Sequence, residues 1–184
     1  MVLLKTGIAL EITSLWKEHT IFSEQITGKQ ELWIFNMKNE IINLINDNIN
    51  NGASIETAGK VENEIIKKAE AELGLAFPPS YREFVSHFGC IEIDGRSFAG
   101  LFPDEDVNED GSVVSFTIFQ RKDLGLPKEY IALDFQDGDY LLCLNSSSVN
   151  AEGESPVVLV SPVSFEETKL NDSFYDYLID YLSA

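Results

Sequence analysis

Histidine and cysteine, the side chains most often used as catalytic bases, nucleophiles and metal ligands, are scarce, with two of each among 184 residues. His19 and His87 are far apart, so histidine acid–base chemistry would depend on His87 alone, which we interpret as a surface or edge residue. Cys90 and Cys143 are too few for a disulfide framework or a zinc site. We expect both to be small core residues, because cysteine is among the most often buried residue types.

Motifs for nucleophilic catalysis and phosphate binding are also missing. Serines 146–148 are not part of a Gly-x-Ser-x-Gly turn, and the glycines of GRSFAG at 95–100 are not followed by Lys-Ser or Lys-Thr. Cys90 has no cation near it in the sequence except Arg96 to lower its pKa. The sequence therefore predicts no enzymatic activity and no bound cofactor.

Basic residues are few. Thirteen Lys and Arg stand against thirty-one Asp and Glu, which gives a formal net charge of -18. This charge repels nucleic acid phosphates and anionic membranes, so we expect neither as a partner. It favours a basic protein partner, because opposite charge speeds diffusional encounter. The alternative is that the acidic surface only keeps the protein in solution.

Long apolar segments are missing as well. The opening MVLLKTGIALEI is too short and too soon charged for a signal peptide, and no apolar run reaches the roughly 18 residues of a membrane span. The sequence therefore predicts a cytoplasmic protein.

The first 36 residues differ from the remainder of the chain. They carry four acids and three lysines, a net charge of -1, whereas residues 37–184 have a net charge of -17. An amphipathic helix is expected to begin at Met37. We therefore interpret 1–36 as a leader and 37–184 as the domain, with Met37 as the hypothetical native start. The mass of the natively expressed protein tests this, and a mass that includes residues 1–36 contradicts it.

Helical spacing of apolar residues predicts two helices near the start of the domain. The first is expected at 37–50, before the NNG stop, and the second from Thr57 to Leu73, ending at Gly74. The apolar residues of the first are Ile41, Ile42, Leu44, Ile45 and Ile49. Those of the second are Val61, Ile65, Ala69 and Leu73.

A third helix is indicated by LGLAFPPSYREFVSHFG at 73–89. Pro78 and Pro79 favour an extended approach followed by a first helical turn, because a proline loses no hydrogen bond there. The spacing places one aromatic and apolar face on this helix, and Gly89 suits a left-handed C-cap. The residues of that face are Tyr81, Phe84, Val85 and Phe88.

From Cys90 onward, short apolar runs alternate with turn residues, which is typical of strands. The expected strands are CIEI, SFAGLF, SVVSF, YIALDF, YLLCLN and PVVLV. QDGD at 136–139 predicts a hairpin, and TIFQRKDLGLP a short helix. A closing helix is expected in NDSFYDYLIDYL, capped by Asn171 or Asp172. This order of helices and strands along the chain predicts an α+β fold, with N-terminal helices on a twisted, mainly antiparallel sheet and a closing C-terminal helix.

Acidic residues in two places form the candidate binding site. The charge density of PDEDVNEDG predicts a loop that projects into water. The functional interpretation is that this loop docks a basic protein surface, and the alternative is a loop that is merely solvated. The hairpin at 136–139 carries further acids, although turns recruit aspartate for backbone reasons as well. The candidate partner-binding residues are Asp104, Glu105, Asp106, Glu109, Asp110, Asp134, Asp137 and Asp139.

DVNEDG at 106–111 matches the first half of a calcium loop. The twelfth position falls on Thr117 where such a loop needs a bidentate glutamate, and we expect a strand, not a helix, after Gly111. The pattern therefore favours a solvated acidic loop over a metal site.

The segment 73–89 resembles the SUKH superfamily (SMI1/KNR4-like), in which a helix ends in Leu-Gly and is followed by Leu-Pro-x-Ser-Tyr-x-x-Phe-Leu and a glycine. The matching residues are Leu73, Gly74, Pro79, Ser80, Tyr81, Phe84 and Gly89. ALDFQDGDYLLCLN resembles the family's later strand pair, and SPVVLV and SFYDYLIDYL extend the similarity, which spans 37–184.

The resemblance implies a function in protein binding. Bacterial members are mostly immunity proteins that neutralise a cognate polymorphic toxin, often a nuclease, and fungal relatives regulate cell-wall synthesis through protein contacts. It therefore implies an antitoxin that occludes a basic toxin stoichiometrically. The alternative is a non-catalytic regulatory module of the same fold that binds another cellular protein.

Overall fold

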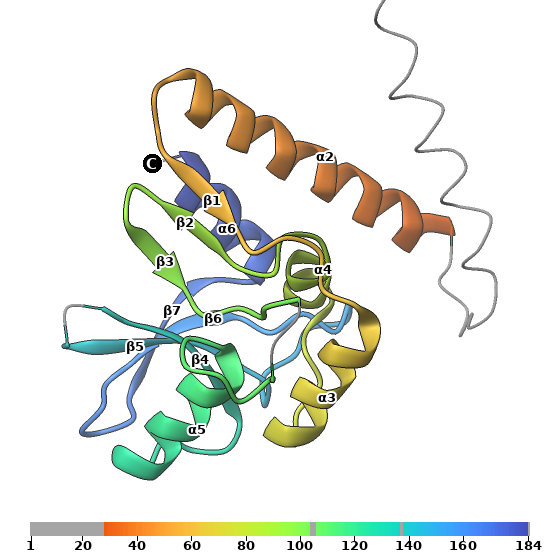
Figure 1. Ribbon diagram of the computed structural model, residues 1–184. Coiled ribbons are helices and arrows are strands. Elements are labelled where there is room, and N and C mark those ends of the chain that lie inside the picture. The colour runs from red at the N-terminus through yellow and green to blue at the C-terminus, as the bar shows by residue number, and fades with distance from the viewer. Residues whose placement is uncertain (1–27, 104–105, 137, 184) are drawn as a thin grey trace, which may run out of the picture. The chain divides into compact units, whose positions relative to one another are not determined.

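The computed structural model describes residues 28–103, 106–136 and 138–183. Asn36–Ala184 form one compact unit. Helices and two antiparallel sheets make up this unit, which confirms the α+β class and the closing C-terminal helix (Figure 1). The strands divide into a three-stranded and a four-stranded sheet. Over the described ranges, none of the helices combines the length and the apolar character that a bilayer crossing needs.

The first described helix, α2, spans Gly28–Asn50 and so begins nine residues before Met37, where the sequence pattern placed its start. Met37 and Ile41 are buried, and Ile49 is exposed. Near the end of the helix, Asn48 Nδ2 donates to the carbonyl oxygen of Leu182 at 2.7 Å. This bond joins the C-terminal ends of α2 and the closing helix.

The predicted helix from Thr57 to Leu73 begins later than expected. Ile55–Thr57 form strand β1, and helix α3 spans Asn63–Leu73. The intervening backbone pairs with a distant segment, since Gly59 N donates to Phe88 O and Val61 N to Ser86 O. Long-range backbone pairing therefore replaces the first six residues of the expected helix.

Helix α3 ends at the Leu-Gly break that the sequence indicated. Gly74 has left-handed backbone angles, φ 68° and ψ 25°. Glu70 Oε1 accepts from Phe77 N at 3.0 Å, and Glu70 Oε2 lies 2.6 Å from Arg82 Nη1. These contacts define the corner between α3 and the next helix.

Helix α4, Pro79–Phe88, begins at the predicted proline. Its second residue, Ser80, forms two hydrogen bonds to a residue distant in sequence. Ser80 N and Ser80 Oγ both donate to the Glu154 carboxylate, at 2.8 and 2.6 Å. Ser80 and Glu154 are both buried. The carboxylate therefore satisfies a helix N-terminal amide that no side chain of α4 caps.

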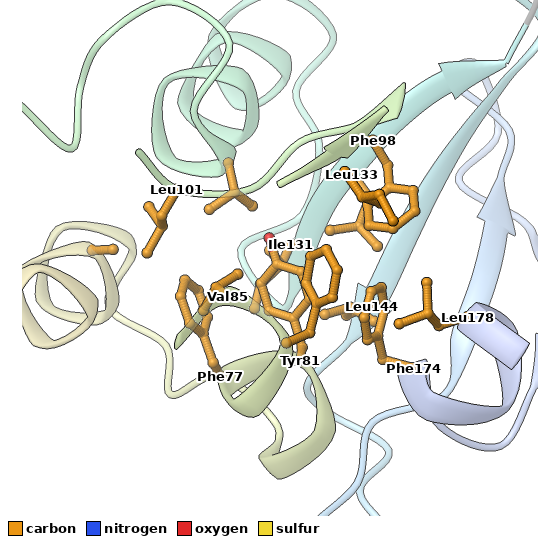
Figure 2. Packing of buried hydrophobic residues seen from close by; sticks show 14 of the residues in the cluster. Phe77, Tyr81, Val85, Phe98, Leu101, Ile131, Leu133, Leu144, Phe174 and Leu178 are labelled. Atoms are coloured by element: carbon orange, nitrogen blue, oxygen red, sulfur yellow. The ribbon is translucent and has the colours of Figure 1, made fainter. Parts of the chain in front are cut away.

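The aromatic face of α4 is the centre of the core (Figure 2). The ring of Tyr81 meets that of Phe174 edge to face at 4.9 Å, and Phe98 meets Phe174 similarly at 5.5 Å. The Tyr81 hydroxyl donates to the carbonyl oxygen of Ala99 at 2.8 Å. Burying each ring of this size contributes roughly 1.5–3 kcal/mol, so these rings fasten α4 to its neighbours.

The smaller sheet follows α4 directly. Strands β2, Ile91–Ile93, and β3, Arg96–Phe98, form a hairpin, and β1 pairs with the free side of β2. The segment after β3 passes very close to the end of α4, where a Cβ on Gly100 would lie 2.2 Å from Gly89 O. Only glycine fits this crossing.

The run SVVSF, predicted as a strand, is helical. Helix α5 spans Val113–Asp123 and includes the residues of the predicted short helix up to Asp123. Ser112 Oγ caps it by accepting from Ser115 N at 3.0 Å. Thr117 Oγ1 accepts from Ala132 N at 3.0 Å, which fixes the helix against the edge of the second sheet. Capping and tertiary packing thus outweigh the strand preference of the two valines.

The second sheet is an antiparallel meander of β4 (Tyr130–Gln136), β5 (Tyr140–Asn145), β6 (Val157–Val160) and β7 (Glu167–Asn171). The β4–β5 pairing confirms the predicted hairpin, with Gly138 at φ 77°. Strand β7 was not predicted, because four of its five residues are exposed and the pattern lacks a buried face.

Strands β4 and β5 of this sheet have buried side chains on both faces. Ile131, Leu133 and Leu144 join the core around α4, while Ala132 and Cys143 pack on the opposite face with Leu126. The long apolar runs YIALDF and YLLCLN follow from this, since a strand covered on both faces has no need for polar alternation.

The closing helix α6 spans Phe174–Ser183. Ser173 Oγ accepts from Asp176 N at 3.1 Å, so Ser173 is its cap and the prediction of Asn171 or Asp172 was wrong. Asn171 is instead the last residue of β7. Phe174, Leu178 and Leu182 are buried, which places one face of α6 in the core.

We expect Gly89→Ala to destabilise the fold by about 2–4 kcal/mol. Gly89 has φ +67°, and a Cβ there would lie 2.6 Å from Leu101 O and 2.8 Å from Gly59 O. Denaturant unfolding measures the change. Gly138→Ala is the matched control, because Gly138 also has positive φ but has open space around the Cβ position. Equal losses in both variants would contradict the steric argument.

The Ser80–Glu154 contact predicts a pH dependence of stability. Burial raises the pKa of the Glu154 carboxyl above its ordinary 4.5, although the Ser80 hydrogen bonds lower it. The folded state therefore binds this proton more tightly than the unfolded chain, and the stabilisation by protonation grows as pH falls from neutral towards about 4.5.

Accordingly, the stability of Glu154→Gln relative to wild type should be highest at neutral pH and should decrease as the pH is lowered. Urea unfolding at several pH values measures this difference. Glu72→Gln, at an exposed position of α3, is the control for removing one negative charge. A pH-independent difference for Glu154→Gln would contradict the raised pKa.

Candidate functional site

In the acidic loop before α5, residues 106–111 are described, and their carboxylates are exposed. Val107 is buried, and its carbonyl oxygen accepts from Ser112 Oγ at 2.6 Å. Asp106, Glu109 and Asp110 are exposed. Asp104 and Glu105, the other two predicted binding residues of this loop, lie outside the described residues. The loop is therefore anchored by its apolar and serine side chains, and the described acids remain accessible.

The geometry of this loop does not match a calcium site. Asp106 Oδ1 accepts from Asn108 N at 3.2 Å, and Thr117, at the twelfth position, is buried against β4 with its hydroxyl bonded to Ala132. Elsewhere in the described ranges, too, no three His, Cys, Asp or Glu side chains are grouped to hold a metal ion.

The hairpin acids occupy different environments. Asp134 lies within β4, opposite Leu142, and its Oδ1 accepts from Phe135 N at 2.7 Å. Asp139 is exposed in the turn, and Asp137 lies outside the described residues. Asp134 also faces α6, where burial, the neighbouring Tyr181 and the Asp134 charge raise the pKa of Tyr177 to about 12.

The two groups of acids do not form one patch. In Figure 1 the β4–β5 turn lies at the left edge of the domain, well separated from the segment that leads into α5. Of the predicted binding residues that the structure describes, Asp106, Glu109 and Asp110 share one loop, whereas Asp134 belongs to β4 and Asp139 to the turn after it.

His87 lies beside a serine and a glutamate on α4, but the contacts differ from those of a catalytic triad. Its Nδ1 is 3.0 Å from Ser86 Oγ and 3.2 Å from Glu83 Oε1. A triad needs the base to use one ring nitrogen for the nucleophile and the other for the acid. Here one nitrogen contacts both, which is typical of a helix surface cluster.

The two cysteines are protonated thiols at neutral pH. Burial raises the pKa of Cys90, and burial beside the Glu167 charge raises the pKa of Cys143 further. Cys143 is fully buried, as expected, whereas Cys90 is only half-buried. A nucleophilic thiolate needs a lowered pKa, so this environment is opposite to that of a reactive cysteine.

Cys90 borders a surface pocket of about 390 Å³ that the sequence pattern did not reveal. The pocket lies over strands β1 and β2 and is lined by Glu56, Thr57, Ala58, Cys90, Glu92, Phe102 and Pro103. Thr57 was expected to begin a helix and Glu56 was not assigned to an element, so no sequence signal brought them next to Glu92. Phe102 also approaches the acidic loop, because a Cβ on Gly111 would lie 3.8 Å from its ring.

The residues of the 73–89 motif serve the scaffold. Leu73, Ser80, Tyr81 and Phe84 are buried, and Gly74 and Gly89 adopt positive φ values. Each has a packing, capping or turn contact inside the domain. The motif therefore explains the fold.

A family model described as SMI1-KNR4 cell-wall (SUKH_5) matches residues 38–183 of the chain. The match covers α2 from Lys38 through α6, and so includes both sheets, the acidic loop and the pocket. No curated protein has a significant sequence match.

Proposed function

The chain belongs to the SMI1-KNR4 family of the SUKH superfamily, and from this premise we propose that it is an immunity protein that neutralises a cognate toxin. It acts in the cytoplasm by stoichiometric occlusion, and the toxin is a basic protein, in the first place a nuclease. The alternative within the family is a regulatory module that binds another cellular protein.

The main support for the proposal is that aromatic residues of the 73–89 motif are buried in the core, whereas the acidic side chains of the loop are exposed. Tyr81 and Phe84 of the motif are almost completely buried, whereas Asp106, Glu109 and Asp110 are exposed on an anchored loop. A scaffold of this kind presents a surface that can differ between relatives without altering the core. Such a surface suits an inhibitor that must match one particular toxin.

The net charge supports a basic target. With -17 on residues 37–184, the protein attracts cationic proteins over a distance set by the salt concentration. A nuclease presents a basic path to its nucleic acid substrate, and an acidic inhibitor lying over that path blocks it. Occlusion requires contact area and complementary charge, and needs no reacting group in the inhibitor.

Co-expression tests the proposed function. We expect the protein to restore growth to cells that produce the toxin encoded by the adjacent open reading frame, and to form a stable complex with it. Growth inhibition of equal strength with and without the protein would contradict neutralisation. An isolated gene with a partner other than a toxin would favour the regulatory module.

The acidic loop should control the rate of association. Replacing Asp104, Glu105, Asp106, Glu109 and Asp110 by Asn or Gln should slow association roughly tenfold at low salt and flatten its salt dependence. Surface plasmon resonance at several salt concentrations measures both effects.

A second variant controls for net charge. It carries five neutral substitutions on other exposed acids, namely Glu64, Glu72, Asp123, Glu152 and Glu166. An equal loss of rate in both variants would assign steering to the total charge. Unchanged kinetics in the loop variant would remove this loop from the interface.

A further inference from the structure

Two glutamates face each other across the smaller sheet. Glu56 of β1 and Glu92 of β2 are directly opposite in the antiparallel register, and both are exposed. Like charges in this position repel each other. Among the described residues, neither glutamate forms an ion pair with a basic side chain. In the described part of the fold, both carboxylates therefore lack an ion-pair partner.

The pair belongs to the lining of the 390 Å³ pocket. Side chains alternate along β2, so Glu92 points outward while Ile91 and Ile93 are buried in the core. Cys90 and Ala58 add an uncharged part to the lining, and Phe102 adds an aromatic one. The volume lies in the range of ligand pockets, roughly 300–1,000 Å³.

The pocket is held rigidly by the backbone around it. Ala58 N donates to Cys90 O at 3.3 Å, and Leu101 N donates to Gly89 O at 3.0 Å. The glycine crossing at Gly89 and Gly100 leaves no space for either segment to move inward. Backbone hydrogen bonds and close packing therefore hold the segments that carry the two glutamates and Phe102, and a site held in this way lowers the entropy cost of binding.

We propose that this pocket receives an arginine side chain of the basic protein partner. Its guanidinium group lies between the Glu56 and Glu92 carboxylates, and its planar face packs on Phe102. Arginine suits this arrangement because its planar fork donates to two carboxylates and also stacks on an aromatic ring. The alkyl part of the side chain covers Ala58 and the thiol of Cys90.

This inference rests on the proposed function, since it assigns a contact of the same protein partner, but it can be tested without the partner. The probe is N-acetyl-arginine amide, and N-acetyl-citrulline amide is the neutral analogue of nearly the same shape. Titration of the full ¹⁵N-labelled chain should give saturable amide shifts at Glu56, Cys90, Glu92 and Phe102. Citrulline should bind roughly fivefold more weakly or not at all.

The carboxylate pair is tested by Glu56→Gln with Glu92→Gln. This variant should lose the arginine-specific shifts, and its thermal midpoint should be unchanged or raised because a repulsion has been removed. Glu64→Gln with Glu72→Gln removes the same charge from α3 and should bind the probe as wild type does. Equal binding of both amides, shifts distributed over the acidic surface, or a lowered midpoint of the Glu56 and Glu92 variant would overturn the proposal.

The toxin complex separates this inference from the proposed function. If the toxin binds wild type and the Glu56 and Glu92 variant equally well, the pocket assignment is wrong and the immunity function stands. If the arginine probe binds in the pocket but the protein does not neutralise the adjacent toxin, the immunity function is wrong. A roughly fivefold or greater loss of toxin affinity in the variant, with the α3 control unaffected, supports both.

Discussion

Burial of the aromatic face of α4 is the interaction on which the remainder of the domain depends. Tyr81 and Phe84 pack on Phe174 of α6, and Phe98 of β3 packs on the same ring. A single cluster of rings thereby joins the central helix, the closing helix and the smaller sheet. The Tyr81 hydroxyl donates to the carbonyl oxygen of Ala99, and Ala99 N donates to Leu133 O on β4. These two bonds link α4, the segment after β3, and β4. The two sheets are thus connected through one tyrosine and one short stretch of backbone.

This core explains why the surface can carry the function. The anchored acidic loop and the pocket beside β1 both lie at segments whose positions are set by the core, and Phe102 lies between them. In the proposed complex, a long-range attraction from the net charge and a short-range contact in the pocket act at different stages of binding. The first accelerates encounter and the second slows dissociation. A binding protein needs both to be fast and selective.

Local signals in the sequence predicted the elements that local interactions determine. The Pro-Pro corner, α4, the Asp-Gly hairpin and α6 are of this kind, and the 73–89 motif identified the family. Strand β1 was missed because its partner β2 lies more than thirty residues away and its own three residues carry no pattern. The valines of SVVSF favoured a strand, whereas Ser112 and Thr117 make the segment a helix by contacts that only the folded chain contains. For the same reason the sequence did not predict that Glu56 lies opposite Glu92, because this position depends on the register of two distant strands.

The contact between Ser80 and Glu154 has a consequence for the order in which the chain acquires its structure. The carboxylate that completes the first turn of α4 lies 74 residues further on, in the connection between β5 and β6. During synthesis on the ribosome, α4 emerges long before this glutamate does, so its N-terminal amide remains hydrated until the later sheet has formed. Closing so long a loop is slow compared with forming a helix. A truncated product that ends before Glu154 would therefore lack this bond.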